Sequence, residues 1–407
     1  MSAALPLSPE ALRRRRSLRS LVVILILGVV GTLILVFRAK LRGPSDPDAF
    51  LEALPPLRDD VALVAFTVGP EGKPVPGEGV VRHNADQMFP LAAVSRIPVL
   101  LAYARAVDEG RVTADEAVTV SEWERHYLPG TDGGAHGKAL RAFDLKLAQG
   151  GFALEPRKTV TLDQLATAMI THGDHAAGDY LIGRLGEGFV DAVVRDAGLQ
   201  HHDPVLPNAA LFLLASTAGD EAGARALLAK GRPAVAQAAR TAWQAFLRDE
   251  AGTPAQRTWL DKHPTPEAGV QSLWSDQAMT QGAAGEYADL LARVAVGAWG
   301  TPKQGEIVRR HLGWPLALEG NAELFTALGS KGGTLVSIMT EAMYAVPKQG
   351  DFQGKTRVVV FFQRRMPSLR WFALVRSFIH QHFMLKLAVD RAFFEATDTQ
   401  LRSAPSP

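Results

Sequence analysis

An uncharged apolar run near the N-terminus, Leu21 to Phe37, constrains this chain more than any other feature. At about 17 residues, it has the shortest length that crosses a bilayer as a helix. Five arginines lie just before the run and three basic residues just after it. Because the basic excess lies on the N-terminal side, we predict a cytoplasmic basic tail at 1–20, a single-pass anchor at 21–37 and a main domain outside the cytoplasm, at the cell membrane.

A cleaved signal peptide is the alternative interpretation of this run. Its apolar core is long for a signal peptide, and Phe37-Arg38-Ala39-Lys40 is a poor match to a small-residue cleavage site. We therefore favour the uncleaved anchor, followed by a linker at 38–47, a domain at 48–400 and a tail at 401–407.

Composition excludes several function classes. The chain has no cysteine, which removes disulfides, thiol catalysis and thiolate metal sites. Its net charge of +2 is too small to indicate a nucleic-acid partner. With 407 residues, the chain can bury a large core or form two subdomains.

Strand-like segments lie at both ends of the domain. Apolar and β-branched runs at 61–68 and 79–83 predict an N-terminal hairpin, and 334–346 and 356–363 predict strands near the C-terminus. The residues between are mostly helical in pattern. We therefore predict an α+β fold, in which an antiparallel sheet of N- and C-terminal strands is flanked by helices and carries an inserted all-helical subdomain at about 111–325.

A long amphipathic helix is predicted at 369–396, with its apolar face packed on the sheet. A membrane-surface role for its basic residues Arg370, Arg376 and Lys386 is a less favoured alternative. Within the subdomain, 251–266 contains several prolines and is predicted to be a loop.

Three short segments carry the chemical signal. The first, FPLAAVSRIPVLLAYARAVDEG at 89–110, predicts a helix that begins near Val94. The second, MITHGDHAA at 169–177, forms a turn between helices predicted at 162–170 and 176–185. The third, SKGGT at 330–334, leads into a predicted strand.

In this order, the segments resemble the active-site motifs of class A β-lactamases and related penicillin-recognising serine hydrolases, over roughly residues 61–364. The family opens a helix with S-x-x-K. The flanking FPLA and IPVLLA place Ala93 at the serine and Arg96 at the lysine. The resemblance implies a hydrolase fold, but these two substitutions imply lost catalysis.

The other two motifs are also degenerate. Gly173, Asp174 and His175 occupy the S-D-N positions. Lys331 is retained at the K-[ST]-G motif, where Gly332 lacks the hydroxyl, and Thr334 is a candidate to supply one from farther along. The segment PVLPN at 204–208 is the nearest match to the family's E-x-x-L-N loop, and it has no glutamate.

The substitutions remove the groups that acyl transfer requires. Ala93 offers no nucleophile, and Arg96 stays protonated and cannot act as a base. Ser95 lies about 200° around the helix from Ala93, so its hydroxyl should point away from the site and bond locally. Catalysis through Ser95 remains an alternative.

The residues left at the site suggest ligand binding. Arg96, Asp174, Lys331 and Thr334, together with the N-terminus of the helix, are predicted to form a positively polarised pocket for a carboxylate or a cell-wall peptide. The competing interpretation is that Arg96 and Asp174 merely pair with each other.

Neither a metal nor a cofactor is predicted. His172, Asp174 and His175 lie close in sequence, as do His201, His202 and Asp203, but neither spacing is a strong metal motif. The Gly-rich segment 128–137 is either a mobile lid or a surface connection.

We therefore predict a catalytically inactive, membrane-anchored binding or regulatory protein of the cell envelope. Two alternatives remain open: an active hydrolase that uses Ser95 or a metal, and a structural scaffold without a ligand.

Overall fold

The computed structural model describes residues 44–248 and 266–402. Outside these residues lie the predicted tail at 1–20, the anchor at 21–37, residues 38–43 of the linker, residues 251–265 of the predicted loop and residues 403–407 of the C-terminal tail. Within the described ranges, no helix combines the length and apolarity needed to cross a bilayer.

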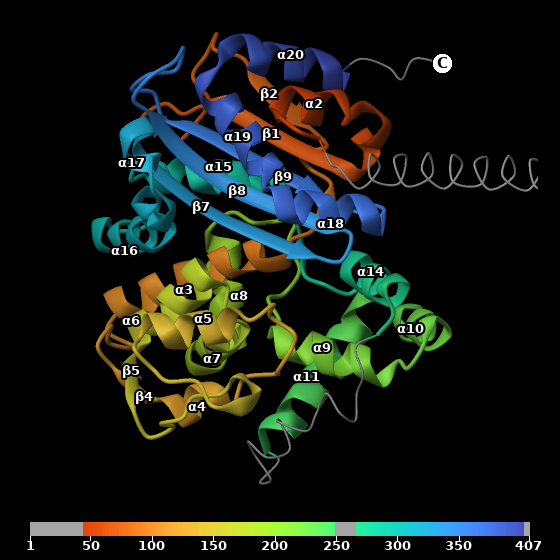
Figure 1. Ribbon diagram of the computed structural model, residues 1–407. Helices are drawn as coiled ribbons and strands as arrows, with labels where there is room; N and C mark the ends of the chain where they lie inside the picture. The colour runs from red at the N-terminus through yellow and green to blue at the C-terminus, as the bar shows by residue number, and fades with distance from the viewer. Residues whose placement is uncertain (1–43, 249–265, 403–407) are drawn as a thin grey trace, which may run out of the picture.

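A five-stranded antiparallel sheet organises the described domain (Figure 1). Its strand order is β2-β1-β9-β8-β7. The strands are β1 (Val61–Thr67), β2 (Val80–His83), β7 (Phe325–Leu335), β8 (Ile338–Pro347) and β9 (Arg357–Gln363). Since β1 pairs with β9 along its whole length, N- and C-terminal strands meet at the centre of the sheet, which confirms that prediction.

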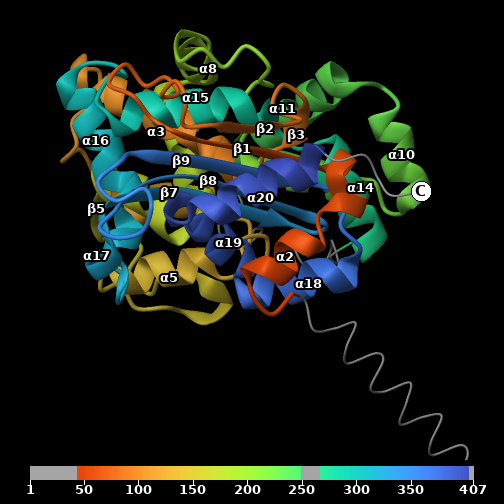
Figure 2. The ribbon, with the colours of Figure 1, turned by 90° about the horizontal axis from the view of Figure 1, so that it is seen from above.

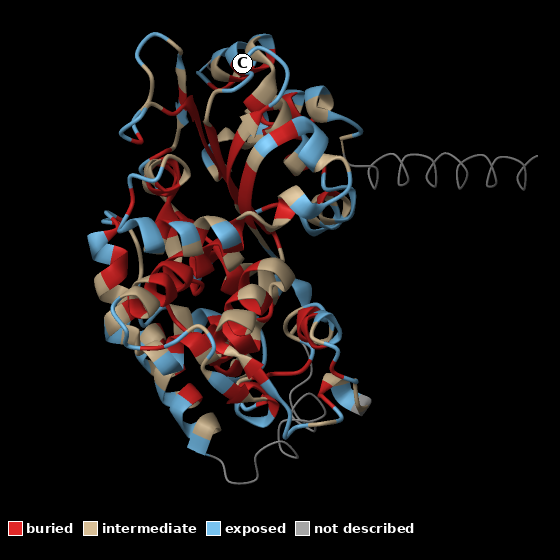
Figure 3. Ribbon diagram, turned by 90° about the vertical axis from the view of Figure 1, so that its left-hand side faces the viewer, coloured by how far each residue is buried: buried red, intermediate tan, exposed pale blue. Residues whose placement is uncertain are grey.

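Helices cover both faces of the sheet (Figure 2). One face packs on α15 (Ala284–Ala295), and the other on α2 (Pro47–Glu52), α19 (Ile379–Val389) and α20 (Arg391–Arg402). Every residue of β1 and β9 is buried, which explains their continuous apolar sequences (Figure 3).

The inserted region is mainly helical, and most of it lies below β7 (Figure 1). Its helices on the N-terminal side are α3 (Arg96–Asp108), α4 (Val120–Glu124), α5 (Ala135–Ala142), α6 (Leu162–Thr167), α7 (His175–Leu185), α8 (Glu187–Asp196) and α9 (Asn208–Thr217). Those that follow are α10 (Glu221–Leu228), α11 (Arg232–Arg248), α14 (Ala268–Gln277), α16 (Pro302–Leu312) and α17 (Asn321–Leu324).

The prediction of an all-helical insert is wrong in one respect. Two small antiparallel pairs lie in or beside it: β4 (Ala117–Thr119) with β5 (Thr159–Thr161), and β3 (Met88–Pro90) with β6 (Gln281–Ala283). Each strand has three residues, too short for a period-two pattern to reveal.

The predicted strand at 334–346 is in fact parts of two strands. β7 and β8 are joined by a tight turn in which Ser337 has a φ of 67°, the left-handed region that sequence patterns associate with Gly or Asn. β7 begins at Phe325, and the SKGGT motif lies inside it rather than before a strand. Its glycines and polar residues concealed the strand.

The predicted helix at 369–396 is three helices: α18 (Ser368–Ser377), α19 and α20. The first break lies at Phe378, which has a left-handed φ of 53°. The second lies at Asp390, whose side chain accepts a hydrogen bond from the Phe393 backbone N–H at 2.9 Å and so caps α20.

Candidate active site of a serine-hydrolase fold

Two adjoining cavities follow the free edge of β7. The first, of about 280 Å³, brings together the three segments that the sequence singled out: Ala93, the turn at 171–175 and the strand residues 331–334. The second, of about 470 Å³, shares Asp132, His175, Thr334 and Val375 with the first. We call these two cavities the β7 groove.

Ala93 lies where β7 approaches η2, the 3-10 turn Ala92–Ser95 that precedes α3. A Cβ placed on Gly333 would lie 2.3 Å from the Ala93 backbone nitrogen. The Thr340 hydroxyl on β8 donates to the carbonyl of Leu91, the residue before this turn, at 2.8 Å. This hydrogen bond links the turn to the sheet. Ala93 lines the groove, and its methyl side chain offers no group that can attack.

Ser95 is buried, and its hydroxyl donates to the Ala92 carbonyl at 2.7 Å. This is the local hydrogen bond that the sequence predicted. Among the described residues, those that line the groove do not include Ser95.

Arg96 lies behind the groove rather than in its wall. Arg96 is 2% exposed. Its Nη1 lies 3.8 Å from the position that a Cβ added to Gly173 would take. Within the described part of the chain, none of its three guanidinium nitrogens has a hydrogen-bond partner. Burial lowers the pKa of Arg96, while the carboxylates of Asp179 and Asp174 oppose this shift.

The Asp174 carboxylate contacts His136 rather than Arg96, the partner that the sequence suggested. Its Oδ2 lies 3.0 Å from Nδ1 of His136, whose Nε2 lies 3.4 Å from a Glu124 carboxylate oxygen. All three side chains are buried. Although burial opposes its protonation, the carboxylates raise the pKa of His136 to about 9. Asp174 also accepts from the Ala177 N–H at 3.3 Å, capping α7, so the interpretation of a direct Arg96–Asp174 pair is wrong.

Lys331 points from β7 toward the buried side of the groove. Its ammonium donates to the Gly332 carbonyl at 2.7 Å. Burial, reinforced by the charge of Arg96, lowers the pKa of Lys331 to about 7, while Glu341 opposes the shift.

Glu341 is a site residue that the sequence analysis missed. It lies on β8 opposite Gly332, is buried and lines the groove. The Ser330 hydroxyl donates to its carboxylate, and Gln381 Nε2 donates to it at 3.2 Å. His380 Nε2 lies 3.8 Å from Oε2 of Glu341. A lone glutamate in the apolar run IMTEAMYAVP was the available signal.

The groove therefore carries both signs of charge. Asp132 and Glu341 line it alongside Lys331. The pocket that we predicted to be positively polarised thus also contains acidic groups, and the Arg96 charge is set back behind Gly173. Thr334 lines both cavities, but its hydroxyl is engaged at the β7–β8 turn, where it donates to the Ile338 carbonyl at 3.1 Å and accepts from the Trp371 indole at 3.0 Å.

Residues 75–262, which contain the first two motifs, match the model of the Beta-lactamase enzyme family. These residues belong to the β-lactamase family.

Solved structures show likeness at low identity. A PBP-A mutant in an acyl-enzyme complex with penicillin G is 16% identical, with a TM-score of 0.48, over 85% of this chain and 96% of that one. A β-lactamase from Sphaerobacter thermophilus is 17% identical, with a TM-score of 0.48, over 83% and 95% of the two chains. A class A β-lactamase representative from Bacteroides cellulosilyticus is 14% identical, with a TM-score of 0.47, over 84% and 99%.

Three of the histidines that the sequence singled out have local partners. The His175 ring stacks on Phe212 with centroids 5.6 Å apart, and burial lowers its pKa well below the usual value. His201 bonds to Glu286, and His202 bonds to the Tyr287 hydroxyl. Over residues 44–248 and 266–402, no group of three His, Cys, Asp or Glu side chains is placed to hold a metal ion.

The Gly-rich segment predicted at 128–137 borders the groove. Gly130 to Gly133 line the second cavity, and α5 begins at Ala135. Asp132 accepts hydrogen bonds from the Gly134 and His136 backbone N–H groups, which ties the segment to α5. A lid motion of this segment remains a prediction.

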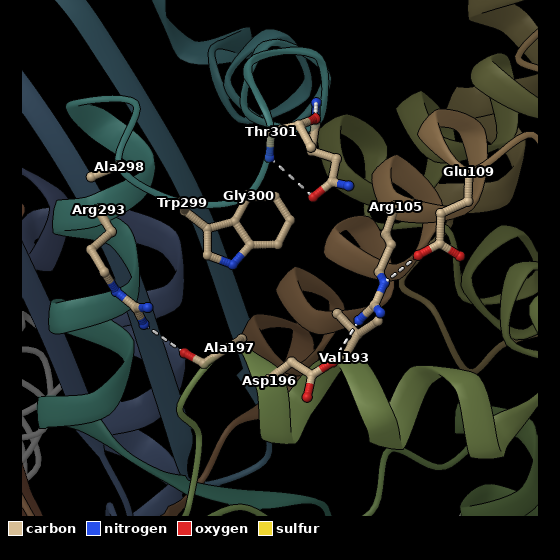
Figure 4. Close-up of a pocket in the computed structure, with 11 residues that line it drawn as sticks. Arg105, Glu109, Val193, Asp196, Ala197, Arg293, Ala298, Trp299, Gly300 and Thr301 are labelled. Atoms are coloured by element: carbon tan, nitrogen blue, oxygen red, sulfur yellow. Dashed lines mark hydrogen bonds and ion pairs between the residues drawn. The ribbon is translucent and has the colours of Figure 1, made fainter.

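A third cavity, of about 360 Å³, lies away from the groove between α3, α8, α15 and α16 (Figure 4). Its two arginines already donate to protein acceptors: Arg105 to Glu109 and Asp196, and Arg293 to the Ala197 carbonyl. We assign it no ligand.

Proposed function

We propose that this chain is a membrane-anchored, extracytoplasmic member of the β-lactamase family that binds a cell-envelope ligand without forming an acyl-enzyme. The observation that carries the proposal is the alanine at position 93, which lines the groove where the family's nucleophile would stand. Acyl transfer requires an attacking oxygen and a base, and neither Ala93 nor Arg96 supplies one.

The edge of β7 supports a peptide or peptide-like ligand. β7 is the last strand of the sheet, so we expect an extended chain to pair with part of its outer edge, beyond the Ser330 carbonyl, which already accepts from the Trp314 indole at 3.1 Å. The groove beside it holds Lys331 for a carboxylate, and Glu341 and Asp132 for a cationic group. We therefore expect the ligand to carry both charges, as a peptide with a free carboxyl end and an amino group does.

The anchor at 21–37 supports a location at the membrane surface. The run has the length of a spanning segment, and the excess of basic residues before it favours a cytoplasmic N-terminus. A domain held there would meet cell-wall fragments and peptides directly.

The test combines covalent labelling with reversible binding. We expect no mass adduct when the full chain is incubated with a penicillin-type probe, and saturable binding of a cell-wall peptide by calorimetry. Lys331→Met should weaken that binding, while Lys146→Met, a change outside the groove, should not. A covalent adduct would overturn the proposal.

Two further outcomes separate the alternatives. Hydrolysis of a reporter ester that disappears in Ser95→Ala, or with a chelator, would favour an active enzyme. A folded chain that binds no cell-wall peptide would favour a scaffold.

A further inference from the structure

Helix α18 presents an apolar surface outward. Leu369 and Phe372 on the helix, and Phe378, which follows its last residue and also lines the groove, are 49%, 50% and 55% exposed. The other side of α18 is held by the domain: Leu374 is buried, and Trp371 and Val375 line the groove. The helix is thus anchored on one side and exposes large apolar side chains on the other.

Two details mark this surface as more than scattered exposed residues. The Arg376 guanidinium lies 5.3 Å from the centre of the Phe372 ring, so a cation accompanies the exposed aromatic. Phe378 adopts a left-handed φ of 53°, which is costly for a bulky residue, and this conformation holds an exposed ring at the junction with α19.

The position of α18 relates this surface to the start of the domain. Arg370 donates to the Ala53 carbonyl, just after α2, at 3.4 Å, and Figure 2 shows α18 beside α2. Nine residues, 38–46, separate the apolar run 21–37 from the first residue of α2. Nine extended residues reach at most ~30 Å, so α2 and its neighbour α18 must stay close to the bilayer.

We propose that α18 lies on the membrane surface, with Leu369, Phe372 and Phe378 inserted at the boundary between headgroups and acyl chains. This proposal rests on the anchor included in the proposed function. The partner is a lipid bilayer because an apolar face flanked by arginine suits an anionic interface. Arg38, Lys40 and Arg42 in the connecting segment add to that attraction.

The proposal has a consequence for the site. Trp371, Val375 and Phe378 also line the β7 groove, so membrane contact through α18 would hold the mouth of the groove beside the bilayer surface. The ligand would then be captured from the layer next to the membrane rather than from distant cell wall.

The absence of cysteine allows a direct test with single-cysteine labels in the full chain. Phe372→Cys is labelled with an environment-sensitive fluorophore and reconstituted in phosphatidylcholine–phosphatidylglycerol vesicles, with and without nitroxide-labelled lipid. We expect a blue-shifted emission that nitroxide lipid quenches, with a label depth of about 5–10 Å. The matched control is Leu154→Cys, which is 59% exposed and falls between β4 and β5 in the sequence. Both of these strands lie away from α18 (Figure 1).

A second variant tests whether the apolar side chains of the protein, rather than the attached fluorophore, cause the insertion into the bilayer. Adding Leu369→Ser and Phe378→Ser to Phe372→Cys should reduce the quenching at least several-fold. Equal emission at positions 372 and 154, in a chain that floats with the vesicles, would overturn the proposal for α18 alone. A chain that fails to float would instead refute the anchor.

Discussion

The carboxylate of Glu341 occupies the space that a side chain at position 332 would need. A Cβ on Gly332 would lie 2.3 Å from Glu341 Oε2. The acid on β8 and the absence of a side chain at position 332 on β7 are therefore sterically coupled. The wall of the groove that would present a hydroxyl presents a buried carboxylate instead.

Gly332→Ser should therefore lower the free energy of unfolding by about 1–3 kcal/mol, the usual effect of overpacking. Glu341 cannot move aside easily, because Ser330 and Gln381 both donate to it. Thermal or denaturant unfolding of the purified chain measures the effect. In the Glu341→Ala background, Gly332→Ser should lower the free energy of unfolding by much less than it does in wild type. If the losses of the two single variants simply add in the double variant, Glu341 is not the group that obstructs residue 332.

Gly333→Ala should be more damaging than an ordinary glycine replacement. Its Cβ would meet the Ala93 backbone nitrogen at 2.3 Å and the Ala92 Cβ at 2.9 Å. We expect a loss of about 1–3 kcal/mol in unfolding free energy. Gly188→Ala is the control, because it lies in α8 with open space around it and should stabilise by at most about 1 kcal/mol. Equal effects at the two positions would refute the close approach of β7 to η2.

Lys331 should make stability rise with pH. Its pKa falls from 10.5 to about 7 on folding, so between these values the unfolded chain binds the proton and the folded chain does not. Stability therefore rises across this window, at up to about 1.4 kcal/mol per pH unit. Comparison of unfolding free energies between wild type and Lys331→Met from pH 6 to pH 10 measures this slope, and identical slopes would contradict the prediction.

His136 should have the opposite effect. Its pKa rises from 6.5 to about 9 on folding, so its contribution is complete below pH 6.5 and is lost as pH rises through 9. His136→Phe should cost about 3–5 kcal/mol at neutral pH, because it leaves the carboxylates of Glu124 and Asp174 without the buried imidazolium. In His136→Phe, the fall in unfolding free energy that the histidine causes between pH 6.5 and 9 should be absent. A variant as stable as wild type would show that the buried triad is not ionised as described.

Restoring the two lost groups tests the alignment of the first motif. We expect Ala93→Ser with Arg96→Lys to form a slow covalent adduct with a penicillin-type probe, detected by intact mass. The adduct should persist, because 204–208 offers no glutamate to activate water. Ala93→Ser alone is the control and should label less, since Arg96 cannot act as a base. A folded double variant without an adduct would count against placing Ala93 and Arg96 at these positions.

The sequence by itself determined the features that depend on local pattern. The apolar run at 61–68 predicted β1, the helical periodicity after Phe89 predicted α3, and the motif order predicted that Ala93, Asp174 and Lys331 belong to one region. Ala93 and Lys331 do line one cavity, and Asp174 lies directly between its wall residues Gly173 and His175. Residue type alone showed that Ala93 cannot attack.

Only the tertiary structure decided the partners and the electrostatics of the site. The Asp174–His136 contact, the setting of Arg96 behind Gly173 and the packing of Glu341 over Gly332 join residues on different elements. The breaks at Ser337 and Phe378 also depend on packing, because neither residue type favours a left-handed conformation. Local periodicity records which face of an element is buried, but not which buried group lies opposite it, and the charge of this groove depends on those opposite groups.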